Sequence, residues 1–177
     1  MHRLFAALPV PAEISAPLTG LQKSLTGASW RPQENFHITL RFFGDLDRKL
    51  AEELDLHLAE IQAPQMQLEI QGVGWFGRRE PYAVFARIAE NEALSRLAGA
   101  CERAARRVGL PPEPRRFRPH ITLAYCHGTP LDEAMSWSER HQAFVDGPFW
   151  ADRFHLYESH LRKGPSTYVA EAEYPLR

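Results

Sequence analysis

The sequence predicts an α+β protein with two lobes related by approximate duplication, which we expect residues 1–177 to form as a single domain. Strand-like segments with a two-residue period alternate with segments of helical period. No glycine pattern of the Rossmann or P-loop type stands between a strand and a helix. The tetrapeptide His-Ile-Thr-Leu occurs twice, beginning at His37 and at His120, 83 residues apart. Each copy lies on a predicted strand, so we expect one copy in each lobe.

The first third of the chain is predicted to begin with a strand and to contain two helices. The elements expected are a strand over 3–8, a helix over about 12–24, a short extended piece from Trp30, a strand over 36–43 and a helix over about 47–61. Ile14, Leu18 and Leu21 recur at helical spacing in the first helix. Asp47 is a suitable N-cap for the second helix, and Pro64 lies just beyond its end.

The remaining chain is predicted to contain one long helix and several strands. The elements expected are a strand over 66–73, a turn or bulge over 74–77, a strand over 82–88, a helix over 92–108, a loop over 110–119, a strand over 120–125, a short helix near Asp132, and strands over 149–161 and 167–174. Asn91 is placed to cap the long helix, and Gly109 supplies a stop at its end. The signals between Gly128 and Gly147 are weak.

Composition limits the classes of partner and compartment. The chain is 44% hydrophobic and 24% charged, with a formal net charge of −1. A polyanionic partner must therefore be held by a local basic patch, because the protein has no overall positive field. Pro9 and Pro11 interrupt the only apolar run near the N-terminus, and no window has the length of a membrane span. The two cysteines, Cys101 and Cys126, favour a reducing compartment, and we expect a cytoplasmic protein.

Side chains alternate between the two faces of a strand. In the first copy of the motif, simple alternation places one apolar set on the helix side and a second set on the opposite face. The apolar set is Phe36, Ile38, Leu40 and Phe42, and the opposite set is His37, Thr39, Arg41 and Phe43. In the second copy the inward set is Ile121, Leu123 and Tyr125, and the opposite set is His120, Thr122, Ala124 and Cys126.

This inventory of side chains suits in-line attack at phosphorus. Two imidazoles that titrate near neutral pH can act as general base and general acid. Thr39 and Thr122 can each donate a hydrogen bond to a phosphate oxygen, and Arg41 supplies a fixed positive charge. The chemistry requires neither a nucleophilic side chain nor a metal, so we expect no cofactor.

A single His-x-Thr match carries little information, because about 0.3 matches are expected by chance in this composition. A third match at His127 is followed by Pro130 and flanked by glycine, so it is interpreted as a turn. Each tetrapeptide taken alone favours a structural histidine, whereas the pair favours a shared function. Zinc ligation by His37 and His120 is the weaker alternative, because no further His, Cys or carboxylate motif accompanies them.

Beyond the paired tetrapeptides, the flanking stretches resemble those of a known family. These stretches are RLFAALPVP, WRPQENFHITLRFFGD, GVGWF, RFRPHITLA, LYES and GPSTY. The paired motifs are similar to those of the two-histidine (2H) phosphoesterases. The flanks most resemble the RNA 2′,3′-cyclic phosphodiesterases, also called 2′-5′ RNA ligases (the ThpR/LigT-like group). The resemblance extends over most of the chain.

The resemblance implies a bilobal fold in which two antiparallel sheets face each other across a central groove, with helices on the outer faces. It implies hydrolysis of RNA 2′,3′-cyclic phosphate ends to 2′-phosphomonoesters, with 2′-5′ ligation as a possible reverse activity. It also implies that His37 is the proton donor and His120 the proton acceptor, and that Thr39 and Thr122 hold the phosphate oxygens. The family often has an arginine shortly after the second motif, where this chain has Tyr125.

Four further residues are predicted to bind the substrate: Arg41, Phe43, Arg118 and Tyr125. Arg118 ends a proline- and arginine-rich loop that either is solvated or follows phosphates along the groove. Phe43 and Tyr125 are candidates for stacking on bases, and Trp30 is more typical of core packing. We interpret His155 and His160 as structural; Tyr157 and Ser159 share a strand face with His155 and are candidates to line the groove.

Three other functions remain open from the sequence. The same site would suit a 2′-5′ oligonucleotide, a small cyclic nucleotide or an ADP-ribose cyclic phosphate. A non-catalytic RNA- or tRNA-binding module is a second class. Zinc binding is a third. The partner we expect is RNA with 2′,3′-cyclic phosphate ends, tRNA fragments included, bound by a monomer that does not associate with membranes.

Overall fold

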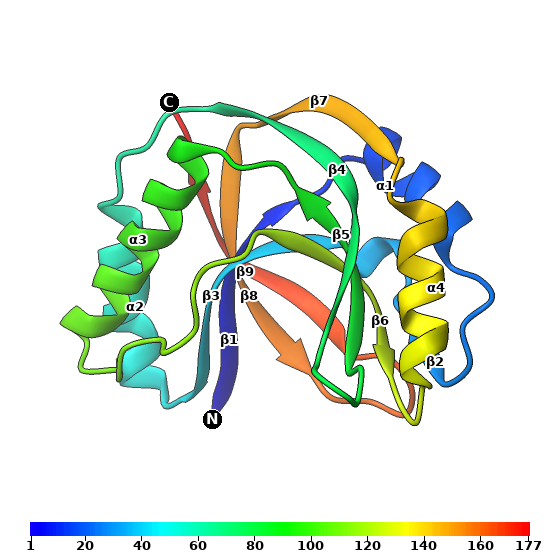
Figure 1. Ribbon diagram of the computed structural model, residues 1–177. Helices are drawn as coiled ribbons and strands as arrows, with labels where there is room; N and C mark the ends of the chain where they lie inside the picture. Colours follow the sequence, from blue (N-terminus) through cyan, green and yellow to red (C-terminus); the bar gives the residue numbers. More distant parts are fainter.

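The computed structural model describes residues 1–177 and contains nine strands and four α-helices (Figure 1). The strands are β1 (His2–Pro9), β2 (Ala28–Trp30), β3 (His37–Leu46), β4 (Met66–Phe76), β5 (Ala83–Ile88), β6 (His120–Cys126), β7 (Val145–Ala151), β8 (Arg153–His160) and β9 (Thr167–Pro175). The α-helices are α1 (Ala12–Leu18), α2 (Arg48–Ala59), α3 (Glu92–Arg107) and α4 (Leu131–His141). Single 3₁₀ turns lie at Thr19–Leu21 and Gln33–Asn35.

All strand pairs are antiparallel, and the order is β7-β4-β5-β6-β3-β1-β8-β9, with β2 added to β6. The strands β3 and β6 pair through one residue pair, Ile38 with Ile121. We call β3, β1, β8 and β9 the first sheet, and β7, β4, β5, β6 and β2 the second sheet. The predicted α+β class is therefore confirmed. The strands form one antiparallel sheet, whose two parts are joined at the Ile38–Ile121 pair.

The helices lie in two pairs on opposite sides of the molecule (Figure 1). Helices α2 and α3 contact the first sheet at β9 and β3, and helices α1 and α4 contact the second sheet at β7 and β4. Helix α1 follows β1 in the chain yet packs on the other sheet, and α3 follows β5 yet packs on the first. Each lobe is consequently built from both halves of the sequence. The internal duplication stays a prediction.

Both predicted helix caps are present. The Asp47 carboxylate accepts a hydrogen bond from the backbone N–H of Leu50 (2.8 Å), and the Asn91 side chain accepts one from the N–H of Leu94 (3.0 Å). Such caps satisfy N–H groups that have no partner inside the helix, which fixes where α2 and α3 begin. None of the four helices combines the length and apolar character that crossing a bilayer requires.

Some predicted boundaries are wrong. The turn or bulge expected at 74–77 is not there: residues 74–76 pair regularly with β5 as the end of β4, which continues to Phe76. The glycine that suggested a turn, Gly74, instead leaves room for the side chain of Phe85, because a Cβ there would lie 2.6 Å from its ring. The short helix expected near Asp132 extends to His141, and the single strand expected over 149–161 is broken at Asp152 into β7 and β8.

Candidate active site

The two copies of the tetrapeptide meet in the middle of the molecule, where β3 and β6 are adjacent (Figure 1). The central isoleucine of one copy, Ile38, pairs with that of the other, Ile121. Because the strands are antiparallel, the next residue on either side brings His37 toward Thr122 and Thr39 toward His120. The repeat thus places two imidazoles and two hydroxyls around one point.

Both strands contain a β-bulge at the same position of the motif. The register of β3 with β1 shifts after Thr39, so that Leu40 is an extra residue. Likewise, the register of β6 with β5 shifts after Thr122, and Leu123 is the extra residue. An extra residue reverses the alternation of faces beyond it. In consequence the residues that follow each tetrapeptide lie on the face opposite to the one that simple alternation predicts.

The bulge in β3 overturns the predicted placement of Arg41 and Phe43, which do not share the face of His37. Arg41 is 9% exposed and lies on the helix side, where its Nε donates to the Glu102 carboxylate (2.5 Å) and its Nη2 to the carbonyl of Pro111 (2.7 Å). Phe43 is buried in the hydrophobic core. The free positive charge that we expected beside His37 is therefore turned away and neutralised by an ion pair.

The bulge in β6 has the same effect on the residues after the second copy. Tyr125, predicted to point inward, is 42% exposed and lines the cleft beside His37. Ala124 and Cys126, predicted on the face of His120, are buried instead. In β3 the side chain at the position equivalent to Tyr125 is Phe42, which the alternation had assigned to the core.

The two histidines are held in the same way. The Nδ1 of His37 donates to the backbone carbonyl of Asn35 (2.7 Å), and the Nδ1 of His120 donates to the carbonyl of Arg118 (2.6 Å). A carbonyl can only accept, so Nδ1 carries the proton in each neutral ring. Each Nε2 is then the free acceptor, and neither Nε2 has a hydrogen-bond partner within the protein. Both rings are thus oriented for proton transfer through Nε2.

Aromatic side chains surround both imidazoles. The ring neighbours are Phe5 and Tyr168 for His37, at 4.9 and 5.3 Å between centroids, and Phe76 and Phe85 for His120, at 4.8 and 5.2 Å. Burial among these rings disfavours the charged form and, with a smaller contribution from the nearby His120, lowers the pKa of His37 to about 4. Burial also lowers the pKa of His120, with a smaller contribution from the Arg115 guanidinium.

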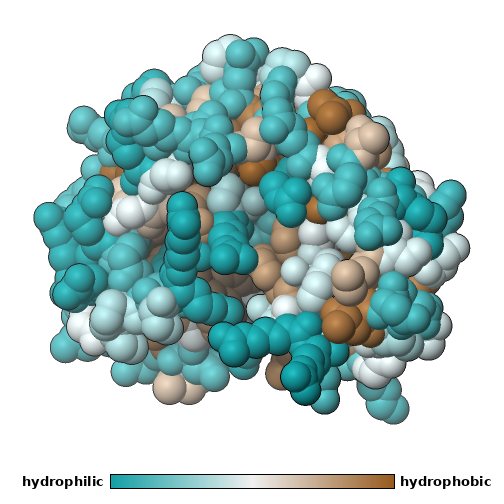
Figure 2. Space-filling view, viewed as in Figure 1, coloured by the Kyte–Doolittle hydropathy of each residue, from teal (hydrophilic) through white to brown (hydrophobic).

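The cleft around His37 has a volume of about 230 Å³ and no acidic lining residue. It is lined by Arg3, Phe5, Arg31, His37, Thr39, Phe42, Tyr125, Ser159, Leu161, Ser166 and Tyr168. Figure 2 shows a hollow near the centre of the face in view, with hydrophilic side chains along its edge. The hydroxyls of Thr39 and Thr122 are half-buried and make no hydrogen bond within the protein, so both remain available to a ligand.

Arg118 lies apart from this cleft. Its side chain lines a larger depression of about 1030 Å³ between α3 and the loop that precedes β6, together with Arg87 and Arg116. The depression reaches Pro119 and Phe85, which are neighbours of His120. Beside His120, Arg118 contributes its backbone carbonyl, which orients the His120 ring.

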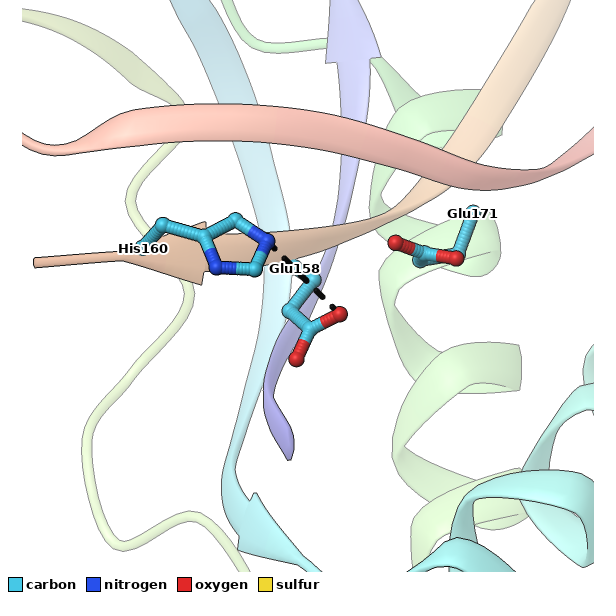
Figure 3. A group of neighbouring side chains, drawn as sticks. All are labelled: Glu158, His160 and Glu171. Carbon is cyan, nitrogen blue, oxygen red and sulfur yellow. Dashed lines mark ion pairs between the residues drawn. The ribbon is translucent and has the colours of Figure 1, made fainter. Parts of the chain in front are cut away.

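The histidines near the C-terminus do not join the paired imidazoles. His155 is hydrogen-bonded to the Tyr157 hydroxyl (3.0 Å). His160 forms an ion pair with Glu158 (3.8 Å), and Glu171 lies beside them (Figure 3). Glu158 and Glu171 line a separate depression that is also lined by residues of α2. Ser159, which stands between Glu158 and His160 in the chain, lines the His37 cleft instead. The interpretation of His155 and His160 as structural is consistent with these contacts.

Several residues that line the cleft were not predicted from the sequence, among them Phe42, Arg31 and Tyr168. Strict alternation assigned Phe42 to the core because nothing in the sequence marked the bulge at Leu40. Arg31 stands in an irregular stretch between short elements. Tyr168 comes from the C-terminal strand, and only the pairing of β8 with β9 and of β8 with β1 brings it near His37. The one signal in the sequence was that an aromatic residue, Phe42 or Tyr125, stands at the same position after each copy of the tetrapeptide.

Two oriented imidazoles and two free hydroxyls on adjacent strands define a class of site that is suited to proton transfer at an anionic ligand. Comparison with known proteins agrees with this class. Residues 10–163 match the model of the 2′-5′ RNA ligase superfamily. This match covers most of the sequence, and the chain belongs to that superfamily.

Two curated proteins named RNA 2′,3′-cyclic phosphodiesterase and one solved structure illustrate the similarity. An RNA 2′,3′-cyclic phosphodiesterase of Thermotoga maritima is 30% identical over 169 residues, 90% of this chain and 87% of the relative. One of Aeropyrum pernix is 37% identical over 97 residues, so that the chain spans about half (55%) of that relative's length. The crystal structure of E. coli LigT complexed with 3′-AMP superposes with a TM-score of 0.78 at 25% identity, covering 99% of this chain and 98% of that chain.

Proposed function

We propose that the protein hydrolyses the 2′,3′-cyclic phosphate at an RNA end to a 2′-phosphomonoester. The observation that carries the proposal is the meeting of His37 and His120 in one place, each with its Nε2 free. The names of the relatives give the substrate class, and the chemistry of the site fits it. Residues 1–177 would act as one catalytic unit.

In the proposed reaction a water oxygen attacks phosphorus in line with the P–O3′ bond. His120 Nε2 accepts the proton that the water loses as the new P–O bond forms. His37 donates the proton on its Nε2 to the departing 3′ oxygen as the P–O3′ bond breaks. Thr39 and Thr122 donate hydrogen bonds to the non-bridging oxygens, whose charge increases in the transition state. A 5′-hydroxyl in place of water would form a 2′-5′ phosphodiester by the same step, so reversible ligation is expected as a companion activity.

The proton-donor role of His37 depends on the substrate. With a pKa of about 4, only about one His37 in a thousand is protonated at pH 7 in the free protein. A bound phosphate places a negative charge next to the imidazole, which favours its charged form and raises its pKa. We therefore infer that binding of the anionic substrate brings His37 into the protonated form that acid catalysis requires. Arg41 cannot take part in this balance, because Glu102 neutralises it.

Zinc catalysis fits the cleft poorly. A catalytic zinc ion takes three protein ligands, commonly with a carboxylate or thiolate among them. The lining of the His37 cleft contains no Asp, Glu or Cys, so a zinc ion bound by His37 there would find no further strong ligand in that lining. We propose that the protein works without metal or cofactor, on RNA ends that include tRNA fragments, as a cytoplasmic monomer.

The test compares substrates in the presence of excess EDTA. Oligonucleotides of one sequence would carry either a 2′,3′-cyclic phosphate or a 3′-phosphate end, and a 2′-5′-linked dinucleotide and a 3′,5′-cyclic nucleotide would complete the set. We expect turnover of the cyclic-phosphate end alone at a substantial rate, without inhibition by EDTA. Faster turnover of either of the last two substrates, or complete inhibition by EDTA, would overturn the proposal.

A further inference from the structure

Arg31 places a guanidinium in the same cleft as His37 and Thr39 without any acidic partner. It is half-buried and forms no ion pair, whereas Arg3 of the same cleft lies 3.9 Å from Asp45 and Arg41 is paired with Glu102. A charge that is partly removed from water normally has a counter-ion, because its desolvation is costly. Arg31 is thus the one arginine lining the His37 cleft that forms no ion pair within the protein.

The side chain of Arg31 is held in place from two directions. Its Nε and Nη2 donate to the carbonyl of Ser29 (3.3 Å each), and Nη2 also donates to the Ser29 hydroxyl (2.7 Å). Its guanidinium carbon lies 4.9 Å from the centroid of the Tyr125 ring, which is cation–π distance. None of these contacts uses Nη1, so both Nη1 hydrogens remain free to bind a ligand.

The backbone of Arg31 is fixed to the strand that carries His120. Its N–H donates to the carbonyl of Leu123 (2.8 Å), the bulge residue of β6, and its carbonyl accepts from the Gln22 side chain (2.8 Å). Residue Trp30 pairs with Ala124 in the sheet. The β6 bulge therefore does two things: it turns Tyr125 toward the cleft and anchors the backbone from which Arg31 extends over the ring.

We propose that Arg31 binds a phosphate oxygen of the RNA end, and that Tyr125 is a positioning residue that holds the guanidinium in the cleft. The inference rests on the proposed function and extends it to a substrate-binding residue. A guanidinium with free N–H groups is suited to phosphate, and burial of the pair strengthens the interaction. The phosphate is either the reacting cyclic phosphate or the neighbouring phosphodiester on its 5′ side. Arg31 binds the same chemical group in both cases.

The competing explanation is that Arg31 only stabilises the connection between β2 and β3. In that case its replacement lowers thermal stability and leaves substrate binding unchanged. Replacement by Gln keeps much of the side-chain length and removes the charge. Arg48→Gln is a charge-matched control, because Arg48 is an exposed residue of α2 whose ion pair with Glu52 is on the surface and contributes little.

The first experiment measures KM and kcat of Arg31→Gln on two substrates. One is a nucleoside 2′,3′-cyclic phosphate, with a single phosphate, and the other is a dinucleotide with a cyclic end, with two. We expect a loss in kcat/KM of about 10- to 100-fold, the effect of removing one hydrogen bond to a charged group. Loss on both substrates identifies the reacting phosphate, and loss on the dinucleotide alone identifies the neighbouring phosphodiester. Unchanged kcat/KM on both, or the same loss in Arg48→Gln, would overturn the proposal.

The second experiment tests the role of Tyr125 with two variants. Tyr125→Phe retains the ring face and should keep kcat/KM close to wild type, whereas Tyr125→Leu removes it and should raise KM. Because Tyr125 is 42% exposed, both variants should keep the thermal unfolding temperature of the wild type. Equal KM for the two variants would contradict a positioning role.

Binding of a nucleoside 2′-monophosphate, measured by titration calorimetry, separates this proposal from the proposed function. The ligand has the phosphate but undergoes no reaction. If Arg31→Gln weakens its binding about 10-fold or more and Arg48→Gln does not, the assignment of Arg31 stands even if the wild-type protein hydrolyses none of the cyclic substrates. Equal affinity of wild type and Arg31→Gln would overturn the assignment even if the wild-type protein is an active phosphodiesterase.

Discussion

At the scale of single residues, the electrostatic environment of His37 determines when the site can react. The imidazole is buried among aromatic rings and faces no acidic group, and this desolvation outweighs the Asn35 carbonyl, whose hydrogen bond from Nδ1 favours the charged form. Its pKa is about 4, and that of His120 is lowered as well. Both histidines are therefore neutral at pH 7 until an anion binds.

This arrangement predicts different pH dependences for kcat/KM and kcat. The kcat/KM profile reports the free protein, in which the lowered pKa values place the maximum on the acid side of an ordinary histidine and activity falls as pH rises. The kcat profile reports the complex, in which the phosphate raises the pKa of His37, so the alkaline limb of kcat should lie at higher pH than that of kcat/KM. Each limb reports the coupled pair of histidines. Rate profiles between about pH 4 and 9 measure both limbs, and coincident alkaline limbs would refute substrate-assisted protonation.

The two threonine hydroxyls lead to a milder prediction. Thr39→Val and Thr122→Val keep the shape of the side chain and remove one donor to a charged oxygen. Because neither hydroxyl bonds within the protein, stability should hardly change, while kcat should fall by roughly 10- to 100-fold. Steady-state kinetics together with a urea unfolding curve measures both effects. A variant that loses stability but keeps full kcat would show that its threonine stabilises the sheet and takes no part in catalysis.

At the scale of elements, strand β4 supports His120 through a glycine. The ring of Phe85 packs against His120 and lies directly against Gly74. A Cβ at position 74 would lie 2.6 Å from Phe85 Cζ and 2.9 Å from an Arg87 nitrogen. Such a contact is too short to persist, so Phe85 would have to move. The glycine thus lets the aromatic wall of the site lie close to the sheet.

Gly74→Ala is accordingly expected to destabilise the protein by about 1–3 kcal/mol and to lower kcat by displacing Phe85. Gly99→Ala is the matched control. It lies in α3, its Cβ would meet only the flexible end of Arg103 at 3.5 Å, and alanine favours a helix over glycine by up to about 1 kcal/mol. Denaturant unfolding and turnover of both variants make the comparison. Wild-type activity in Gly74→Ala would mean that the Phe85 wall is dispensable.

Most elements could be predicted from the sequence, because apolar periodicity and capping residues are local signals. Asp47 and Asn91 begin their helices as expected. The face of a residue beyond a bulge is not a local property. Arg41 and Tyr125 were placed on the wrong face because the extra residues Leu40 and Leu123 arise from pairing with β1 and β5, which no single strand reveals. The histidines lie before each bulge, and their placement was correct for that reason.

At the scale of the whole molecule, the two sheets share more than the Ile38–Ile121 pair. One hydrophobic core contains buried residues of both lobes, including Leu54 of α2 and Trp137 of α4. Helices α1 and α3 each pack on the sheet opposite to the one of the strand that precedes them. Unfolding one lobe would therefore expose the core of the other, and we propose that residues 1–177 are a single cooperative domain.

The corresponding prediction is a single unfolding transition. Trp137, buried in the lobe of the second sheet, reports that lobe by fluorescence, if the other tryptophans are replaced by phenylalanine. Circular dichroism reports all helices, α2 and α3 included. Both signals should give the same urea midpoint and slope, as two-state unfolding requires. Two separated midpoints would show that the lobes are independent domains.

The central claim is that His37 and His120 together open a cyclic phosphate at an RNA end. The most direct measurement is phosphorus NMR of the product formed from an oligonucleotide with a 2′,3′-cyclic phosphate end, by the wild type and by His37→Ala and His120→Ala. The account predicts a 2′-phosphomonoester as the only product of the wild type. Each variant should retain the fold and lose about 10²–10⁴-fold in rate. A 3′-phosphomonoester product, or near wild-type turnover by either variant, would contradict it.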